Sequence, residues 1–442
     1  MFIQIIKGFI VRLAKGTNMS NLLINYLNRS LTAYHAHDNA VKLLEKNGFV
    51  ELKENQEYKV KIGGKYFVSK DGSALIAFKV GNEFSFNVVA SHSDSPCFKL
   101  KYNPEMKVEN YVKFNVERYG GGLLYSWLDR PVTVAGRVIL SDGDCLESKV
   151  FTSEKTFVIP SVAIHLNRSA NDGLKLNPQT DLSPVVDVFK SGGLTEELEK
   201  FANGKKIEDF DLFVVCNQPA FTAGFDDELL VSPRIDNLTS AISSLEALIA
   251  SEPKAISLAY VADNEEVGSS TKQGAGSKFL IDTLTRISVS LGKKDQLDLA
   301  LANSFMVSDD NAHAIHPNHP ELSDPTNRVK LGEGIVIKHH ANQNYTTDAF
   351  SSALIKKIFS KAEVKYQDFF MRSDMPCGGT LGAISSRQVS IRSVDIGIAQ
   401  LAMHSAVETM ALCDYEHAVK GLTAFYNCKI SSDGSKKLSV EF

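Results

Sequence analysis

Residues 84–94 read FSFNVVASHSD, and this stretch decides the predicted fold. Its first part, residues 84–90, is a nearly continuous apolar run, which is typical of a strand buried on both faces. His92 and Asp94 follow at once. In an open α/β sheet, ligands collect at the carboxyl ends of the strands. The stretch therefore predicts a central strand of an α/β sheet with functional residues at its end.

Helix and strand patterns alternate on both sides of this strand, whereas the middle of the chain has mainly strand patterns. Before it we expect a helix over residues 22–46 and short strands over 58–62, 66–69 and 74–79. Beyond residue 231 the patterns predict helices over 238–249, 279–291, 351–359, 401–412 and 416–425, and strands over 255–262, 299–307 and 388–396. Between about residues 99 and 228, strand-like runs such as 112–118 and 132–140 dominate. The sequence predicts an α/β domain interrupted by a β-rich insertion.

The composition is that of an ordinary globular protein. Of the 442 residues, 43% are hydrophobic and 23% are charged, so the chain can bury a sizeable core. The formal net charge of −4 leaves no basic excess, which argues against nucleic acid as the main partner. Six scattered cysteines form no CxxC pair, so a zinc ribbon and a dithiol redox motif are excluded and a reducing compartment is favoured. No stretch approaches the roughly 18 apolar residues that span a bilayer, so we expect a cytoplasmic protein without a membrane partner.

The first 18 residues, MFIQIIKGFIVRLAKGTN, could be a signal peptide or an N-terminal extension. Lys7 and Arg12 interrupt the apolar stretch, and no convincing small-residue cleavage site follows it. Met19 begins a more natural start. We therefore expect residues 1–18 to be an N-terminal extension, with the signal peptide as the alternative.

Polar clusters recur where predicted strands end or helices begin. They are Asp263-Asn264-Glu265-Glu266, Ser308-Asp309-Asp310, Asp236 at a helix start, and His404 in an amphipathic segment. Each cluster alone has an ordinary structural explanation: a helix cap for Asp236, a turn or solvated loop for the paired carboxylates, and a core histidine for His404. Together, two histidines and three carboxylates are what a pair of divalent metal ions needs. One carboxylate of the adjacent Glu265-Glu266 pair could then bind a metal ion while the other accepts a proton.

Four ordered motifs in these clusters resemble the M18 family of metalloaminopeptidases, the aspartyl aminopeptidase family. They are ASHSDSP at residues 90–96, DNEEVGS at 263–269, DNAHAIHPN at 310–318 and MHS at 403–405. The resemblance implies a di-metal catalytic domain whose mixed β-sheet is flanked by helices, formed by residues 19–97 and 231–442. It implies a β-rich dimerisation domain over residues 98–230, and a tetrahedral dodecamer built from dimers.

The resemblance also assigns the site residues. His92 and Asp310 would bind one metal ion, Glu266 and His404 the other, and Asp236 would bridge the two. Glu265 would be the general base, and Asp94 would orient the His92 ring without itself binding a metal ion. We expect zinc, with manganese or cobalt as alternatives. Asp310 rather than Asp309 fits the family spacing, although Asp309 and Asn311 stand where the family leads us to expect a small residue and a methionine.

Three further features resemble substrate contacts of the family. His165, in the insertion, would complete the active site of a neighbouring subunit; the alternative is a structural histidine. Lys338 could face a substrate carboxylate; the alternative is a surface lysine. Cys377-Gly378-Gly379-Thr380 resembles a glycine-bearing loop near the pocket, where glycines would permit close approach to a peptide.

We therefore expect hydrolysis of the first peptide bond of peptides, preferring Asp or Glu as the first residue, by a metal-activated bridging water with Glu265 as general base. Two other functions fit the same residues. An amidohydrolase would keep the metal ions but cleave N-acylated amino acids. A scaffold protein would use the metal ions only structurally, but such a site has no need of a spare base beside Glu266.

Overall fold

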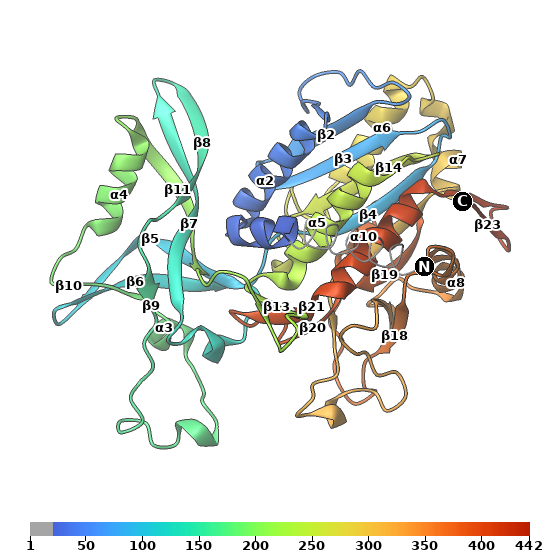
Figure 1. Cartoon of the computed structure of the whole chain (residues 1–442). Helices are drawn as coiled ribbons and strands as arrows, with labels where there is room; N and C mark the ends of the chain where they lie inside the picture. The colour runs from blue at the N-terminus through green and yellow to red at the C-terminus, as the bar shows by residue number, and fades with distance from the viewer. Residues whose placement is uncertain (1–20) are drawn as a thin grey trace, which may run out of the picture.

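The computed structural model describes residues 21–442 and shows two lobes (Figure 1). The larger lobe holds a nine-stranded sheet with most of the helices, and the smaller lobe is built mainly from strands between residues 97 and 216. The predicted N-terminal extension lies outside the described residues. Among the described residues, no helix combines the length and the apolar character needed to cross a membrane.

The central sheet of the larger lobe is mixed. In spatial order its strands are β1 (Val50–Glu51), β2 (Lys65–Lys70), β3 (Ala74–Val80), β14 (Ile256–Ala262), β4 (Phe86–His92), β15 (Phe305–Asp309), β19 (Arg392–Gly397), β17 (Ile335–His339) and β18 (Tyr366–Phe370). The four central strands from β14 to β19 run parallel, whereas β3 and β17 pair with them in the antiparallel sense. Every residue of β4 is buried, which confirms the strand expected from residues 84–90.

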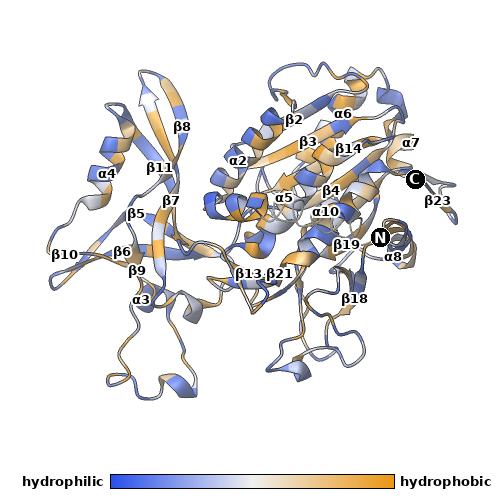
Figure 2. Ribbon diagram, viewed as in Figure 1, coloured by the Kyte–Doolittle hydropathy of each residue, from blue (hydrophilic) through white to orange (hydrophobic). Residues whose placement is uncertain are grey.

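Helices cover both faces of this sheet. One face carries α2 (Ala33–Lys46), α5 (Ile235–Ala250), α8 (Ala349–Lys361) and α10 (Leu412–Asn427), and the other carries α6 (Phe279–Ser290), α7 (Leu297–Ala302) and α9 (Leu381–Ser385). Successive strand residues point to opposite faces, so Val89 packs with the first set of helices and Val88 with the second. The strands β3 and β14 are accordingly largely hydrophobic in Figure 2. The expected α/β class is confirmed.

The smaller lobe is a curled seven-stranded sheet with its own apolar core. Its strands are β5 (Cys97–Val108), β6 (Tyr111–Tyr119), β7 (Pro131–Asp142), β8 (Cys145–Thr152), β9 (Phe157–Val158), β10 (Val185–Val188) and β11 (Lys206–Cys216). The order is β11-β5-β6-β10-β9-β7-β8, and an extra pairing of β11 with β7 closes it into a ring. Phe98, Phe114 and Leu212 lie in its core, and α4 (Gly193–Ala202) packs against it through Leu194 and Leu198. The exact domain boundaries at residues 98 and 230 stay a prediction.

A five-stranded sheet lies between the lobes (Figure 1). Its order is β12 (Phe221–Ala223), β13 (Leu229–Ser232), β21 (Glu408–Ala411), β20 (Ala399–Leu401) and β16 (Ala312–His313), and β22 (Lys429–Ser432) pairs separately with β23 (Leu438–Glu441). The helix predicted over 401–412 is therefore wrong. Ala402 and His404 have left-handed backbone angles, φ 57° and 65°, and β21 pairs with β13, so the helix begins only at Leu412.

Two other expected elements differ from the structure. The strand predicted over 299–307 is wrong in its first half, because Leu297–Ala302 forms α7 and the strand begins at Phe305. Leucine and alanine favour a helix in that short segment. The helix predicted over 22–46 is interrupted before Ala33, where Thr32 is extended (φ −141°, ψ 171°) and the second helix starts.

Candidate metal centre

Three chain segments bring predicted site residues to one edge of the central sheet. His92 is the last residue of β4, Glu265 and Glu266 begin the short helix η3 (Glu265–Val267) after β14, and Asp310 follows β15. The strands β14, β4 and β15 are neighbours and run parallel. Their carboxyl ends therefore meet, which is why residues so distant in the sequence are adjacent here.

The other two predicted ligands arrive from elements outside this set of strands. Asp236 lies in the first turn of α5, where Asp236 and Asn237 have non-helical backbone angles and are joined by a cis peptide bond. His404 lies in the connection between the antiparallel strands β20 and β21. The middle sheet thus carries His404 to the edge at which the central strands end.

The five side chains converge around the carboxylate of Asp236. Its Oδ1 lies 3.7 Å from Nε2 of His92, and its Oδ2 lies 3.3 Å from Nε2 of His404. On the outer sides, Oδ2 of Asp310 lies 3.7 Å from His92 Nε2, and Oε1 of Glu266 lies 3.3 Å from His404 Nε2. Asp236 therefore presents one oxygen to each of two similar clusters.

These spacings fit divalent metal ions. Two ligands about 2.0–2.2 Å from a tetrahedral zinc ion are separated by about 3.3–3.6 Å. In the described part of the chain, buried Asp236 Oδ1 and Glu266 Oε1 have no hydrogen-bond donor, which is costly for carboxylate oxygens unless a cation faces them. Ligand atoms of His92, Glu265 and Asp310 form one possible metal group, and those of Asp236, Glu266 and His404 form another. In the first group Glu265 is the most distant, at 4.0 Å from His92 Nε2.

Asp94 holds both the histidine and the glutamates of the centre. The Nδ1 atom of His92 lies 3.1 Å from the backbone oxygen of Asp94 and 3.4 Å from its Oδ1. The same carboxylate accepts the backbone N–H of Glu265 and that of Glu266, each at 3.1 Å. A proton on Nδ1 leaves Nε2 of His92 free to face the site. This geometry agrees with the orienting role that the sequence predicts for Asp94.

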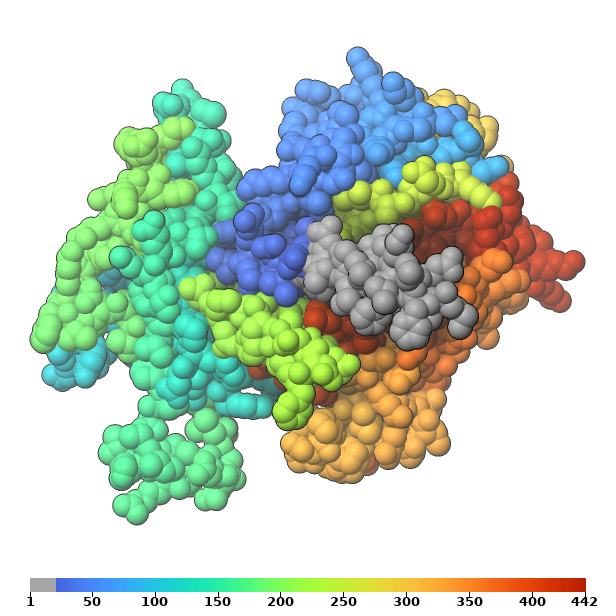
Figure 3. Space-filling view, in the orientation of Figure 1, coloured from blue at the N-terminus to red at the C-terminus, as the bar shows by residue number. Residues whose placement is uncertain are grey.

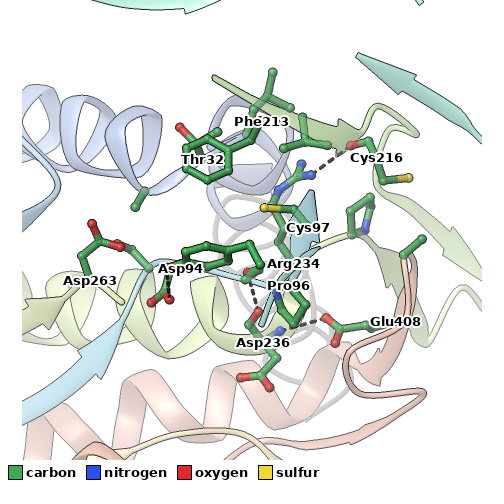
Figure 4. A pocket seen from close by; sticks show the side chains of 18 of the residues that line it. Thr32, Asp94, Pro96, Cys97, Phe213, Cys216, Arg234, Asp236, Asp263 and Glu408 are labelled. Atoms are coloured by element: carbon green, nitrogen blue, oxygen red, sulfur yellow. Dashed lines mark hydrogen bonds between the residues drawn. The ribbon is translucent and has the colours of Figure 1, made fainter. Parts of the chain in front are cut away.

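Glu408 is a supporting residue that the sequence analysis missed. It is buried, and Figure 4 shows it beside Asp236. Its Oε2 accepts the backbone N–H of Asp236 at 2.9 Å, and its Oε1 accepts that of His404 at 2.7 Å. One carboxylate thereby fixes the two segments that carry these predicted ligands. Its only sequence signal is its place four residues after His404, which does not indicate what it binds.

The electrostatics of the centre are those of a buried cluster of acids and imidazoles. Burial alone would lower the pKa of His404, but the carboxylates of Asp236 and Glu266 raise it to about 10. Burial likewise opposes protonation of His92, yet Asp94, Glu265 and Asp310 raise its pKa well above the usual range. Burial raises the pKa of Glu265 to about 7. Burial also raises the pKa of Glu266 well above its usual range.

The structure distinguishes between the two aspartates after β15. Asp310 faces His92, whereas Asp309 is buried, with no hydrogen-bond partner for Oδ2 among the described residues. Lys338 is also buried, so the surface-lysine alternative is wrong. Its Nζ lies 3.3 Å from Asp310 Oδ1 and 5.2 Å from the centre of the Tyr345 ring. Cys377 packs in the same apolar cluster as Tyr345, which puts the glycine-bearing loop near Lys338.

His165 is not brought to this centre within the single chain described. It is exposed, on the segment between β9 and the short helix η2 (Ala170–Asp172). That segment projects from the smaller lobe as a separate knob (Figure 3). The metal groups among the described residues do not include it.

Comparison with known proteins gives one consistent result. The family described as Aminopeptidase I zinc metalloprotease (M18) matches residues 26–426. A probable M18 family aminopeptidase 2 of Clostridium novyi is 43% identical over 427 residues, covering 92% of this chain and 98% of that protein. A probable aspartyl aminopeptidase of Ricinus communis is 37% identical over 469 residues, covering 93% and 96%.

Solved structures agree over the same length. A chain from the complex of Ape4 and Nbr1 superposes with a TM-score of 0.90 and 32% identity, covering 93% of this chain and 86% of that one. A chain from the mApe1 dodecamer of S. cerevisiae gives a TM-score of 0.80 and 26% identity, covering 92% and 96%. Each match covers more than nine tenths of this chain.

Proposed function

The chain belongs to the M18 family of zinc metalloaminopeptidases, and from that premise we propose that it removes the first residue of peptides at a centre of two divalent metal ions. The observation that carries this proposal is the place of Asp236 between two imidazoles, with one oxygen toward each. A bridging carboxylate of this kind suits two ions about 3.5–4 Å apart.

In this proposal His92 and Asp310 hold one ion, Glu266 and His404 hold the other, and Asp236 contacts both. Zinc agrees with the family and with the nitrogen and oxygen donors; manganese and cobalt accept the same donors. When bound, the ions would polarise the scissile carbonyl and lower the pKa of a water molecule. Every other task falls to the side chains of the chain.

Glu265 is the proposed general base. Its carboxylate adjoins the ligand cluster without the short contacts of the ligands, and 15% of its side chain remains exposed against 3% for Glu266. Oε2 of Glu265 would take a proton from the attacking water and give it to the leaving amine. Burial raises the pKa of this carboxyl to about 7, and a base is most effective when its pKa lies near the working pH.

Lys338 supports a preference for acidic first residues. Its ammonium is buried beside Asp310, and a substrate carboxylate could form a charge-assisted hydrogen bond there. The name of the Ricinus relative, an aspartyl aminopeptidase, agrees with this preference. We propose Asp and Glu as the favoured first residues on these two grounds.

We also propose that the active chain is a homo-oligomer, a tetrahedral dodecamer built from dimers, in which His165 reaches the centre of a neighbouring subunit. The similarity to the mApe1 dodecamer supports the assembly. The exposure of His165, Leu166 (83% exposed) and Ile164 (48%) supports burial of this loop by another subunit. Six free cysteines agree with the cytoplasm as the proposed location.

The test is a substrate panel on zinc-loaded protein with metal content measured on the same sample. X-Ala dipeptides with every first residue should be cleaved, fastest for Asp and Glu. N-acetylated forms of the same dipeptides should remain intact. Cleavage of acylated substrates alone would favour the amidohydrolase, and cleavage of neither class would favour a structural role for the metal ions.

A further inference from the structure

A segment of the smaller lobe, residues 119–123, lies directly against the ligands of the metal centre. The hydroxyl of Tyr119, the last residue of β6, donates to Oδ2 of Asp94 at 2.8 Å. Nδ1 of His404 lies 3.3 Å from the backbone oxygen of Gly121, and the N–H of Leu123 donates to the backbone oxygen of His404 at 2.8 Å. The lobe thus touches both halves of the centre.

Tyr119 and His92 contact different oxygens of Asp94, Oδ2 and Oδ1 respectively. Asp94 contacts His92 and accepts the backbone N–H groups of Glu265 and Glu266. The Tyr119 oxygen itself accepts a hydrogen bond from Nδ2 of Asn264 at 2.8 Å. The hydroxyl therefore joins the ends of β4 and β14 through one oxygen atom, and removing it would loosen the carboxylate that orients His92 and the glutamates.

The glycines after Tyr119 allow this close approach. Gly120 has a φ of +73°, and a Cβ there would lie 3.2 Å from Cβ of Glu266 and 3.4 Å from Cα of Pro96. The Gly121 oxygen accepts from His404 Nδ1, which leaves Nε2 of His404 directed at Asp236 and Glu266. The Nδ1 atom of each predicted metal-binding histidine therefore has a partner: Asp94 for His92, and the backbone oxygen of Gly121 for His404.

We propose that Tyr119 is a positioning residue of the metal centre, acting through Asp94, and that the inserted lobe thereby completes the support of the site in addition to any role in assembly. The proposal rests on the proposed function for its turnover readout, but its metal-binding readout is independent of activity. The geometry of the metal centre therefore depends on the position of the smaller, inserted lobe.

The test compares the full-length Tyr119→Phe and Tyr111→Phe proteins. Tyr111 lies on the same strand but is half exposed, and its hydroxyl makes no hydrogen bond to the described residues of the centre. Zinc affinity is measured by competition with a chelator, turnover on an Asp-Ala dipeptide, and thermal unfolding on the metal-free proteins. Tyr119→Phe should lose about tenfold to a hundredfold in zinc affinity or kcat, as loss of a supporting contact of a metal ligand usually causes, with KM unchanged and the metal-free protein still folding cooperatively. Tyr111→Phe should equal wild type.

A double-mutant cycle with Asp94→Asn tests the route. Because Tyr119 acts through Asp94, the double variant should lose little more than Asp94→Asn alone. Wild-type zinc affinity and kcat in Tyr119→Phe would overturn the proposal, and so would fully additive losses in the cycle. If the wild-type protein cleaves no peptide, the proposed function fails, while the zinc-affinity comparison still decides the role of Tyr119.

Discussion

Nε2 of His404 lies 3.3 Å from Oδ2 of Asp236, although Asp236 lies at the start of α5 and His404 in the connection between β20 and β21. Glu408 supports this contact, since its carboxylate accepts the backbone N–H of both residues. A buried carboxylate that is shared in this way fixes two chain segments relative to each other, and with them two predicted ligands.

Replacing Glu408 by glutamine should weaken the centre without removing a predicted ligand. Gln has nearly the same size, but its NH2 group takes the place of one carboxylate oxygen and would face one of the two backbone N–H donors. We expect a loss of about tenfold to a hundredfold in zinc affinity or turnover. The matched control is Glu416→Gln, an exposed residue of α10, which should behave as wild type. Equal zinc affinity and turnover in Glu408→Gln and wild type would contradict this role.

Glu265→Gln and Glu266→Gln should differ in their effect on metal content. Because Glu265 is the proposed base, its variant should keep its zinc but lose at least about a hundredfold in kcat. Glu266 is a proposed ligand, so its variant should lose zinc as well as activity. Zinc is measured by elemental analysis after gel filtration. Near-normal turnover in Glu265→Gln would remove it from the mechanism.

Gly120→Ala should damage the centre more than the same change at Gly143. Both glycines have left-handed backbone angles, φ +73° and +60°, so both variants carry a similar backbone strain. Only at Gly120 does the new Cβ meet Glu266, whereas at Gly143 it meets open space. We expect weaker zinc binding for Gly120→Ala alone. If both variants bind zinc equally, the close approach of this lobe has no bearing on the site.

Zinc affinity should rise with pH across the neutral range. The pKa of His404 is raised to about 10 and that of His92 is also raised, so at neutral pH the metal-free imidazoles are protonated. Zinc needs neutral imidazole, so binding must release protons, and the affinity should rise about tenfold per pH unit for each proton released. Calorimetry in two buffers of different ionisation enthalpy counts these protons. An affinity independent of pH from about 6 to about 8 would contradict it.

The sequence predicted the central strand and the residues at strand ends because these depend on local pattern. His92 ends one buried strand and the Glu265-Glu266 pair lies shortly after the end of another, and the parallel pairing of these two strands brings the residues together. The apolar spacing of residues 401–412 resembles that of a helix, although the backbone at His404 is left-handed and strands flank it. Spacing alone could therefore not place His404. Its role came from the family resemblance.

Glu408 and Tyr119 escaped prediction for a different reason. Their partners, Asp236 and Asp94, lie far away in the chain and belong to other elements, so no periodicity or local motif connects them. Supporting residues of this kind become visible only when the tertiary contacts are known.

The most direct test of the central claim is an anomalous difference map at the zinc edge from crystals of the zinc-loaded protein. We predict two peaks about 3.5–4 Å apart, with Asp236 in contact with both. One peak should adjoin His92 and Asp310, and the other Glu266 and His404. A single peak, or two peaks that Asp236 does not bridge, would contradict the account.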